Sequence, residues 1–166
     1  MENKINNQVI ENNAKQYFLF LLNEEIYAFE ALEVVEIVEY QHITKVPMMS
    51  DFIKGVTNIR GNIIAVLDLM QRFGEEESII KNKTSLVILK NRQTDKELQI
   101  AIIIDEVYEV EQISSSEIEN TPSFGTKIDK KFIKSMVKYN GNYLPILDID
   151  VILNIEELSA LKYKDK

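Results

Sequence analysis

An internal repeat restricts the fold of this chain more than any other feature of its sequence. The segment Phe52–Leu69 aligns without gaps on Phe132–Ile149, at a constant offset of 80 positions. Upstream, Ala28–Ile37 matches Ala101–Val110 more loosely. A repeat of this kind predicts two similar halves, and the alternative is a chance similarity between two β-hairpins.

Both halves are rich in strand signals. Short runs with many β-branched and aromatic residues are separated by Gly, Asn or charged turns. We expect strands at residues 17–22, 25–29, 55–59, 63–67, 85–89, 98–104, 136–139 and 143–147. Each half then holds about five short strands, the usual content of a small barrel that closes its edges. The predicted fold class is all-β, with two small β-barrels.

The repeat and the composition also suggest how the chain is divided. Residues 1–15 are polar and are expected to form a flexible N-terminal tail. The first barrel should cover about 16–75 and the second about 84–149, with a polar boundary at 74–83. Helical patterning is limited to residues 30–37, 68–72 and 150–161. We therefore expect one domain over 16–155, and a C-terminal helix and tail over 150–166.

Composition excludes several classes of function. A hydrophobic fraction of 45% is that of a soluble globular protein, and no apolar run approaches the roughly 20 residues of a membrane span. The chain has no cysteine, which excludes disulfides and thiolate metal sites. A net charge of −8 opposes binding to a phosphate backbone. We expect a cytoplasmic protein that neither binds nucleic acid nor inserts into membranes.

Residues that are the same in both halves are expected to serve the fold. Gly61-Asn62 and Gly141-Asn142 lie between apolar strands, where tight hairpin turns demand a positive φ. Asp68 and Asp148 lie where an apolar strand passes into a polar or helical segment, which suits a helix N-cap. We expect structural roles for both pairs.

Arg60 differs from its counterpart in the repeat, Asn140. The turn itself therefore does not require a guanidinium, and the side chain is available for another role. Alternatively, Arg60 is a solvated turn residue with no functional role.

The segment 30–37 is expected to be a short helix. At 100° per residue its apolar residues gather on one side, and Glu30, Glu33 and Glu36 gather on the other, with Ile37 among the acids. An apolar side chain ringed by carboxylates is typical of a contact surface. Alternatively, the helix ends before Ile37, and this residue begins a buried strand.

The sequence offers little for catalysis. His42 is the only histidine, so a nucleophile–base pair or a cluster of nitrogen ligands has weak support. No glycine-rich phosphate loop is present. We expect no catalytic residue, no metal site, no cofactor and no enzymatic activity, although paired carboxylates cannot be recognised without a structure.

Several segments carry a family resemblance. The run Phe52–Leu69 resembles the signature of the CheW family of chemotaxis adaptors. The segment 17–30 resembles the family's opening hairpin, 34–37 its kinase-contact segment, and 101–107 its second-half motif. Ala65 stands where the family often has proline. The similarity extends over roughly residues 16–155.

The resemblance implies two intertwined barrels of the Src-homology type and a scaffold role. Such a protein couples the regulatory domain of the CheA histidine kinase to the cytoplasmic tips of chemoreceptors. By motif position, Val34, Gly55 and Ile37 are expected to bind the kinase, with Val34 and Gly55 close together in an exposed apolar patch. Glu36 and Arg60 are expected to bind the receptor, although an ion pair between them could instead serve the fold.

Three other functions fit parts of the pattern. The same fold occurs as the regulatory domain of the kinase itself and in CheV-type adaptors that carry a receiver domain. The length of 166 residues, from an initial methionine, leaves no room for either addition. A β-barrel that binds nucleic acid would need exposed aromatic residues on a basic face, which the acidic balance opposes.

Overall fold

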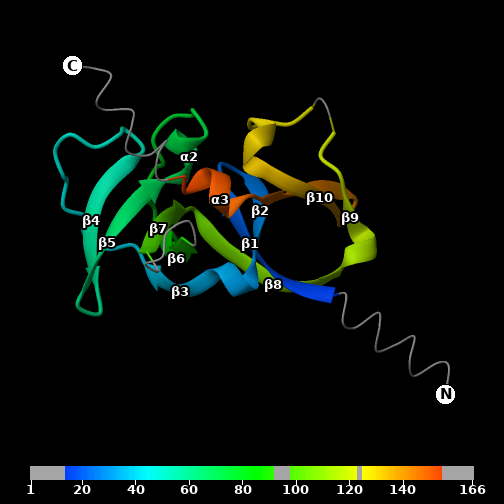
Figure 1. Ribbon diagram of the computed structural model, residues 1–166, viewed down its shortest axis with the longest axis horizontal. Helices are drawn as coiled ribbons and strands as arrows, with labels where there is room; N and C mark the ends of the chain where they lie inside the picture. Colours follow the sequence, from blue (N-terminus) through cyan, green and yellow to red (C-terminus); the bar gives the residue numbers. More distant parts are fainter. Residues whose placement is uncertain (1–13, 92–97, 123–124, 155–166) are drawn as a thin grey trace.

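The computed structural model describes residues 14–91, 98–122 and 125–154, which form two β-sheets with a few short helices (Figure 1). The six-stranded sheet has the order β8 (Glu106–Ser114), β1 (Ala14–Leu22), β2 (Glu25–Glu30), β11 (Asn142–Leu147), β10 (Ile133–Tyr139) and β9 (Ile118–Glu119). The five-stranded sheet has the order β3 (Val34–Glu39), β6 (Ser85–Asn91), β7 (Leu98–Ile104), β5 (Asn62–Asp68) and β4 (Ile53–Ile59). The predicted all-β class is confirmed. In the described part of the chain, no helix is long and apolar enough to cross a membrane.

The two sheets do not follow the predicted boundaries at 16–75 and 84–149. The hairpin β1–β2 lies in the same sheet as β10–β11, and the hairpin β6–β7 lies in the same sheet as β4–β5. Two parallel pairings make these exchanges, one between β2 and β11 and one between β5 and β7. The chain therefore crosses from sheet to sheet twice, between β2 and β3 and between β7 and β8. This exchange agrees with the intertwined arrangement that the resemblance implied.

Three apolar clusters account for the long hydrophobic runs. One cluster lies among the strands of the six-stranded sheet and another among those of the five-stranded sheet. The largest draws residues from both sheets and joins them. In β1, Phe20 belongs to the shared cluster, whereas its neighbour Leu19 belongs to the cluster of its own sheet. Because both faces of the strand are buried, the sequence shows a continuous apolar run instead of an alternating one.

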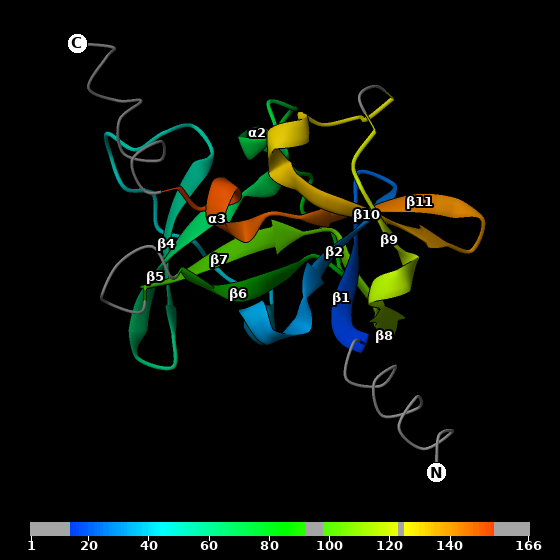
Figure 2. The same ribbon diagram turned by 45° about the vertical axis from the view of Figure 1, so that its right-hand side comes forward.

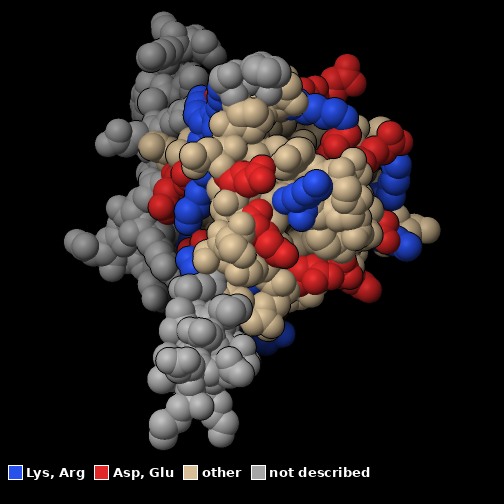
Figure 3. All heavy atoms as spheres, turned by 90° about the vertical axis from the view of Figure 1, so that its right-hand side faces the viewer, with Lys and Arg blue, Asp and Glu red and all other residues tan. Residues whose placement is uncertain are grey.

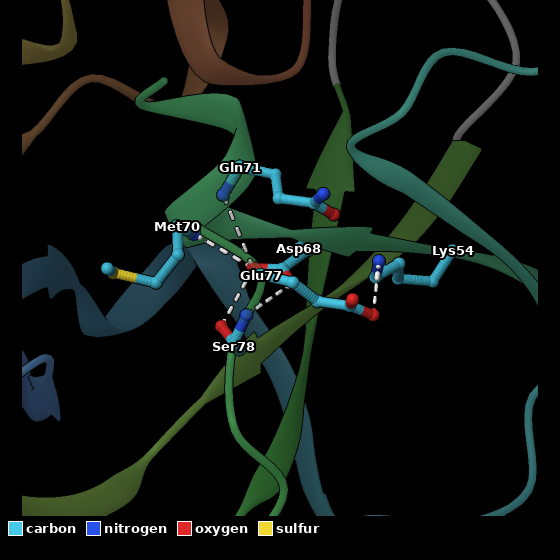
Figure 4. Close-up of polar contacts among 6 residues, drawn as sticks. All are labelled: Lys54, Asp68, Met70, Gln71, Glu77 and Ser78. Atoms are coloured by element: carbon cyan, nitrogen blue, oxygen red, sulfur yellow. Dashed lines mark hydrogen bonds and ion pairs between the residues drawn. The ribbon is translucent and has the colours of Figure 1, made fainter. Parts of the chain in front are cut away.

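The two repeated aspartates cap short helices, as predicted. Asp68 accepts hydrogen bonds from the backbone amides of Met70 and Gln71 at the start of α2 (Leu69–Arg72). It also accepts bonds from the amide and the hydroxyl of Ser78, at 2.9 and 2.7 Å (Figure 4). Asp148 caps α3 (Ile149–Ile152) through the amide of Val151. Of the helix expected over 150–161, only the start lies in α3, and residues 155–161 lie outside the described part.

The hairpin turns are centred one residue earlier than predicted. Arg60 and Gly61 have φ values of 54° and 88°, and Asn140 and Gly141 have 47° and 81°. These pairs form the two-residue loops, and Asn62 already belongs to β5. Two consecutive positive φ values define the turn that matches the twist of a hairpin. The described chain also begins in a strand, because β1 starts at Ala14, inside the predicted tail 1–15.

Candidate functional site

The predicted helix over residues 30–37 is mostly a strand. A single 3₁₀ turn, η1 (Ala31–Glu33), leads directly into β3, which pairs with β6. The register of this pairing shifts between Val34 and Glu36, so one extra residue, Val35, is accommodated in a bulge. Ile37 therefore lies on a strand, as the alternative held, but it is exposed and not buried.

The bulge decides which side chains of β3 share a face. Val34 pairs with Leu89 and Ile37 pairs with Val87, and these two partners lie on one face of β6. Val34 is half-buried against the cluster shared by the two sheets, whereas Ile37 is 40% exposed. Leu32 in η1 is 80% exposed, and Val35 is exposed too. We call the exposed apolar residues Leu32, Val35 and Ile37 the β3 edge.

Glu36 and Arg60 form an ion pair next to the β3 edge. The distance between Arg60 Nη2 and Glu36 Oε1 is 3.2 Å, and the arginine side chain is 79% exposed while the glutamate is 26% exposed. The pair connects β3, at one end of the strand order, with the turn that follows β4, at the other end. An exposed pair of this kind stabilises a fold by only about 0.2–1 kcal/mol, so most of the guanidinium remains available to a partner.

Gly55 has a structural reason to be glycine. It is buried, its φ is 142°, and a Cβ atom there would lie 2.0 Å from the carbonyl oxygen of Thr44. Thr44 and Val56 exchange two backbone hydrogen bonds of 2.8 Å, which hold residues near Thr44 against β4. The expectation of an exposed apolar patch containing Val34 and Gly55 is therefore wrong, because Gly55 is covered by backbone and has no surface to offer.

Glu30 belongs to a different set of contacts from Glu36. Lys15 and Lys134 both bind Glu30 Oε1, at 3.4 and 3.3 Å. Burial acts to raise the pKa of Glu30, but the hydrogen bonds and charges of Lys134 and Lys15 outweigh this effect and hold the pKa below its usual value. Glu30 thus ties β2 to β1 and β10, and it does not surround Ile37 as the helical prediction implied.

The described residues contain no arrangement typical of catalysis. His42 is exposed, and its backbone carbonyl accepts a hydrogen bond from the Thr57 hydroxyl. No group of three or more histidine or acidic residues within the described ranges could hold a metal ion. A cavity of about 450 Å³ lies beside the loop that follows α2, and Glu24, Glu75 and Asp105 are among its lining residues.

Sequence reasoning missed part of the exposed apolar surface. Leu32 and Val35 were predicted on the apolar side of a helix, away from Ile37, and the structure shows that they are exposed. In the second half, β8 also exposes Val107, Tyr108 and Val110. The looser repeat match could have identified them, since it relates Ile37 to Val110. On the face at the six-stranded-sheet end, carboxylates border uncharged surface (Figure 3).

The fold and the site together define a class of protein. The β3 edge is an exposed apolar strip beside a charged pair, which is the usual composition of a protein–protein contact. A two-sheet β protein with such a surface is typical of a scaffold or adaptor.

Comparisons with known proteins identify the family. The family model of the CheW-like domain matches residues 16–157. The chain is 30% identical to the chemotaxis protein CheW of Bacillus subtilis, over 86% of this chain and 88% of that protein. It is 31% identical to CheW of Thermotoga maritima, over 85% and 87%. The crystal structure of the scaffolding protein TtCheW from Thermoanaerobacter tengcongensis is similar, with a TM-score of 0.75, 31% identity, and coverage of 83% of this chain and 86% of that chain. This chain belongs to the CheW-like family, and it is a chemotaxis scaffold.

Proposed function

We propose that this scaffold joins the regulatory domain of a CheA-type histidine kinase to the cytoplasmic tips of chemoreceptors. The observation that carries the proposal is the β3 edge, where exposed apolar side chains lie beside an ion pair with an exposed guanidinium. An apolar strip and a charged pair on one strand offer contacts of two different chemistries. In this role the protein is an adaptor and not an enzyme, and it acts in the cytoplasm at membrane-bound receptor arrays.

The kinase contact is proposed at Val34 and Ile37, together with the rest of the β3 edge. Ile37 supplies exposed apolar surface, and Val34 lies on the same face of β3, half-buried against the shared cluster. Gly55 contributes indirectly, because it allows the chain near Thr44 to lie against β4. A substitution at Gly55 is therefore expected to act through the fold and not through a lost contact.

The receptor contact is proposed at Glu36 and Arg60. A receptor tip is a helical hairpin with charged side chains on its surface, and a guanidinium can fix the register of such a helix through hydrogen bonds. Arg60 extends from the β4–β5 turn, with Glu36 as its neighbour, so the pair can open toward a partner at small cost.

The kinase site is tested by Ile37→Glu, with Leu98→Glu as the matched control. The two side chains have similar exposure, 40% and 43%, but they lie on different strands. Burying an unpaired polar group at a contact costs roughly 1–3 kcal/mol, and a carboxylate costs more, so Ile37→Glu should weaken binding to the kinase regulatory domain by at least about 5- to 150-fold. Leu98→Glu should leave the affinity unchanged in the same calorimetric titration. Equal affinities for both variants would exclude the β3 edge as the kinase site.

A further inference from the structure

Arg72 is a buried charged residue whose counterpart in the repeat is uncharged. It ends α2, its side chain lies in the interior at 6% exposure, and the offset of 80 positions relates it to Ile152. The two halves therefore differ at this point, and the position in the second half is filled by an apolar side chain. An arginine that occurs in one half only has a role that the two halves do not share.

The contacts of Arg72 connect the two halves. Its guanidinium carbon lies 5.2 Å from the ring centre of Phe52 and 4.8 Å from that of Phe132, and these phenylalanines are equivalent in the repeat. Arg72 Nε donates to the carbonyl of Ile152 at 2.8 Å, and Nη2 donates to the carbonyl of Val151 at 2.9 Å. One side chain thus binds α3 and also lies over a ring from each half. Figure 2 shows α2 and α3 in the same region of the molecule, next to the ends of β5 and β11.

Apolar side chains surround this junction. The cluster shared by the two sheets consists of aliphatic and aromatic side chains, and packing among them has no preferred direction. A buried polar group does have a preferred direction, because its donors must meet acceptors at favourable angles. In other proteins a single buried polar residue can select one arrangement of an otherwise apolar contact.

We propose that Arg72 is a positioning residue that holds the two sheets of this scaffold at one relative orientation. The planar fork of the guanidinium fits the two carbonyls of α3 at only one angle between α2 and α3. This angle sets where the β3 edge, carried by the five-stranded sheet, lies relative to the surface of the six-stranded sheet. The inference goes beyond the proposed contacts, which both lie on the five-stranded sheet, because it concerns how the six-stranded sheet is oriented relative to them.

The test measures the distance between the sheets directly. The chain has no cysteine, so spin labels can be attached at Ile63→Cys on β5 and Tyr143→Cys on β11 in the full chain. These positions are 66% and 57% exposed and lie in different sheets. Pulsed electron resonance should give one narrow distance distribution for the labelled parent, and a broadened or shifted distribution when Arg72→Met is added.

A matched control separates orientation from general loss of stability. Ile88→Val creates a small cavity in the cluster of the five-stranded sheet, which is separate from the cluster shared by the two sheets, and should leave the distribution narrow. Arg72→Lys keeps the charge but lacks the planar fork, so its distribution should be wider than that of the parent. If Arg72→Met does not fold, Arg72→Lys carries the test alone. A parent-like distribution for the Arg72 variants that fold, or equal broadening by Ile88→Val, would overturn the proposal.

A second readout depends on the proposed function. Each partner should bind Arg72→Met with nearly the affinity of the parent, because both proposed contacts lie on the five-stranded sheet and do not depend on its angle to the other sheet. Broadened distances with a reduced affinity for one partner would contradict this placement and assign part of that contact to the six-stranded sheet. Loss of binding by the parent itself would refute the proposed function and leave the distance result intact.

Discussion

Replacing Arg60 by Asn separates the receptor role of this residue from its role in the fold. Asparagine occupies the equivalent turn position 140, where it has nearly the same φ, 47° against 54°. The left-handed conformation costs an ordinary side chain about 1 kcal/mol, and asparagine tolerates it better than most residues do. The turn should therefore form as well in the variant as in the parent.

The expected change in stability follows from two opposing effects. Loss of the exposed ion pair with Glu36 lowers the free energy of unfolding by about 0.2–1 kcal/mol. A residue that tolerates the positive φ better raises it by an amount of similar size. The free energy of unfolding should change by less than about 1 kcal/mol, which keeps Tm within about 4 °C of the parent value. Differential scanning calorimetry measures this quantity.

Receptor affinity should respond much more strongly than stability. A charge-assisted hydrogen bond across an interface contributes roughly 1.5–3 kcal/mol, so Arg60→Asn should weaken receptor binding about 10- to 150-fold. Affinity for the kinase regulatory domain should stay within about twofold, because a change of 0.4 kcal/mol corresponds to a factor of two. Normal receptor affinity would refute the assignment of Arg60. A lower Tm with both affinities reduced would instead assign the residue to the fold.

Two further predictions concern positions that hold the fold together. Gly55→Ala should lower the free energy of unfolding, measured in urea, by about 3 kcal/mol, because the new Cβ would clash with the Thr44 carbonyl. The affinities for both partners should fall together. A stable variant with only its kinase affinity reduced would show that Gly55 is a contact residue. Asp68→Ala should lower the free energy of unfolding by roughly 3 kcal/mol, and Asp148→Ala by about 1 kcal/mol. Both aspartates cap a helix, but Asp68 also accepts two hydrogen bonds from Ser78. Equal losses in parallel urea titrations would contradict this reasoning.

Local sequence signals were sufficient for most strands but not for their assembly. The β-branched and aromatic runs predicted β1, β2, β4–β7, β10 and β11 nearly in place. The repeat, however, could not show that β2 pairs with β11, through Ala28 and Ile146, more than a hundred positions apart. The hairpins β1–β2 and β6–β7 bury side chains on both faces, so their local pattern fits a partner from either half equally well. Which sheet a hairpin joins depends on where the chain crosses between the sheets, and no local sequence pattern marks these crossings.

The sequence indicated Glu36, Ile37 and Arg60 but not how they are arranged, and their binding roles stay predictions. Acids spaced three apart at Glu30, Glu33 and Glu36 imitate a helical period, but pairing with β6 and a bulge at Val35 override this pattern. The contrast between Arg60 and Asn140 correctly singled out an exposed arginine. Burial of Gly55 could not be foreseen, because the chain that covers it, around Thr44, reaches β4 only through tertiary contacts.

The most direct test of the scaffold is whether both partners bind at once. The full chain is mixed with a purified CheA-type regulatory domain and a soluble receptor-tip fragment, and the masses of the complexes are measured by analytical ultracentrifugation. If the β3 edge and the Glu36–Arg60 pair serve different partners, a single ternary complex with the summed mass should form. If either partner displaces the other at saturating concentration, the two contacts overlap, and the chain cannot bridge them in the way proposed.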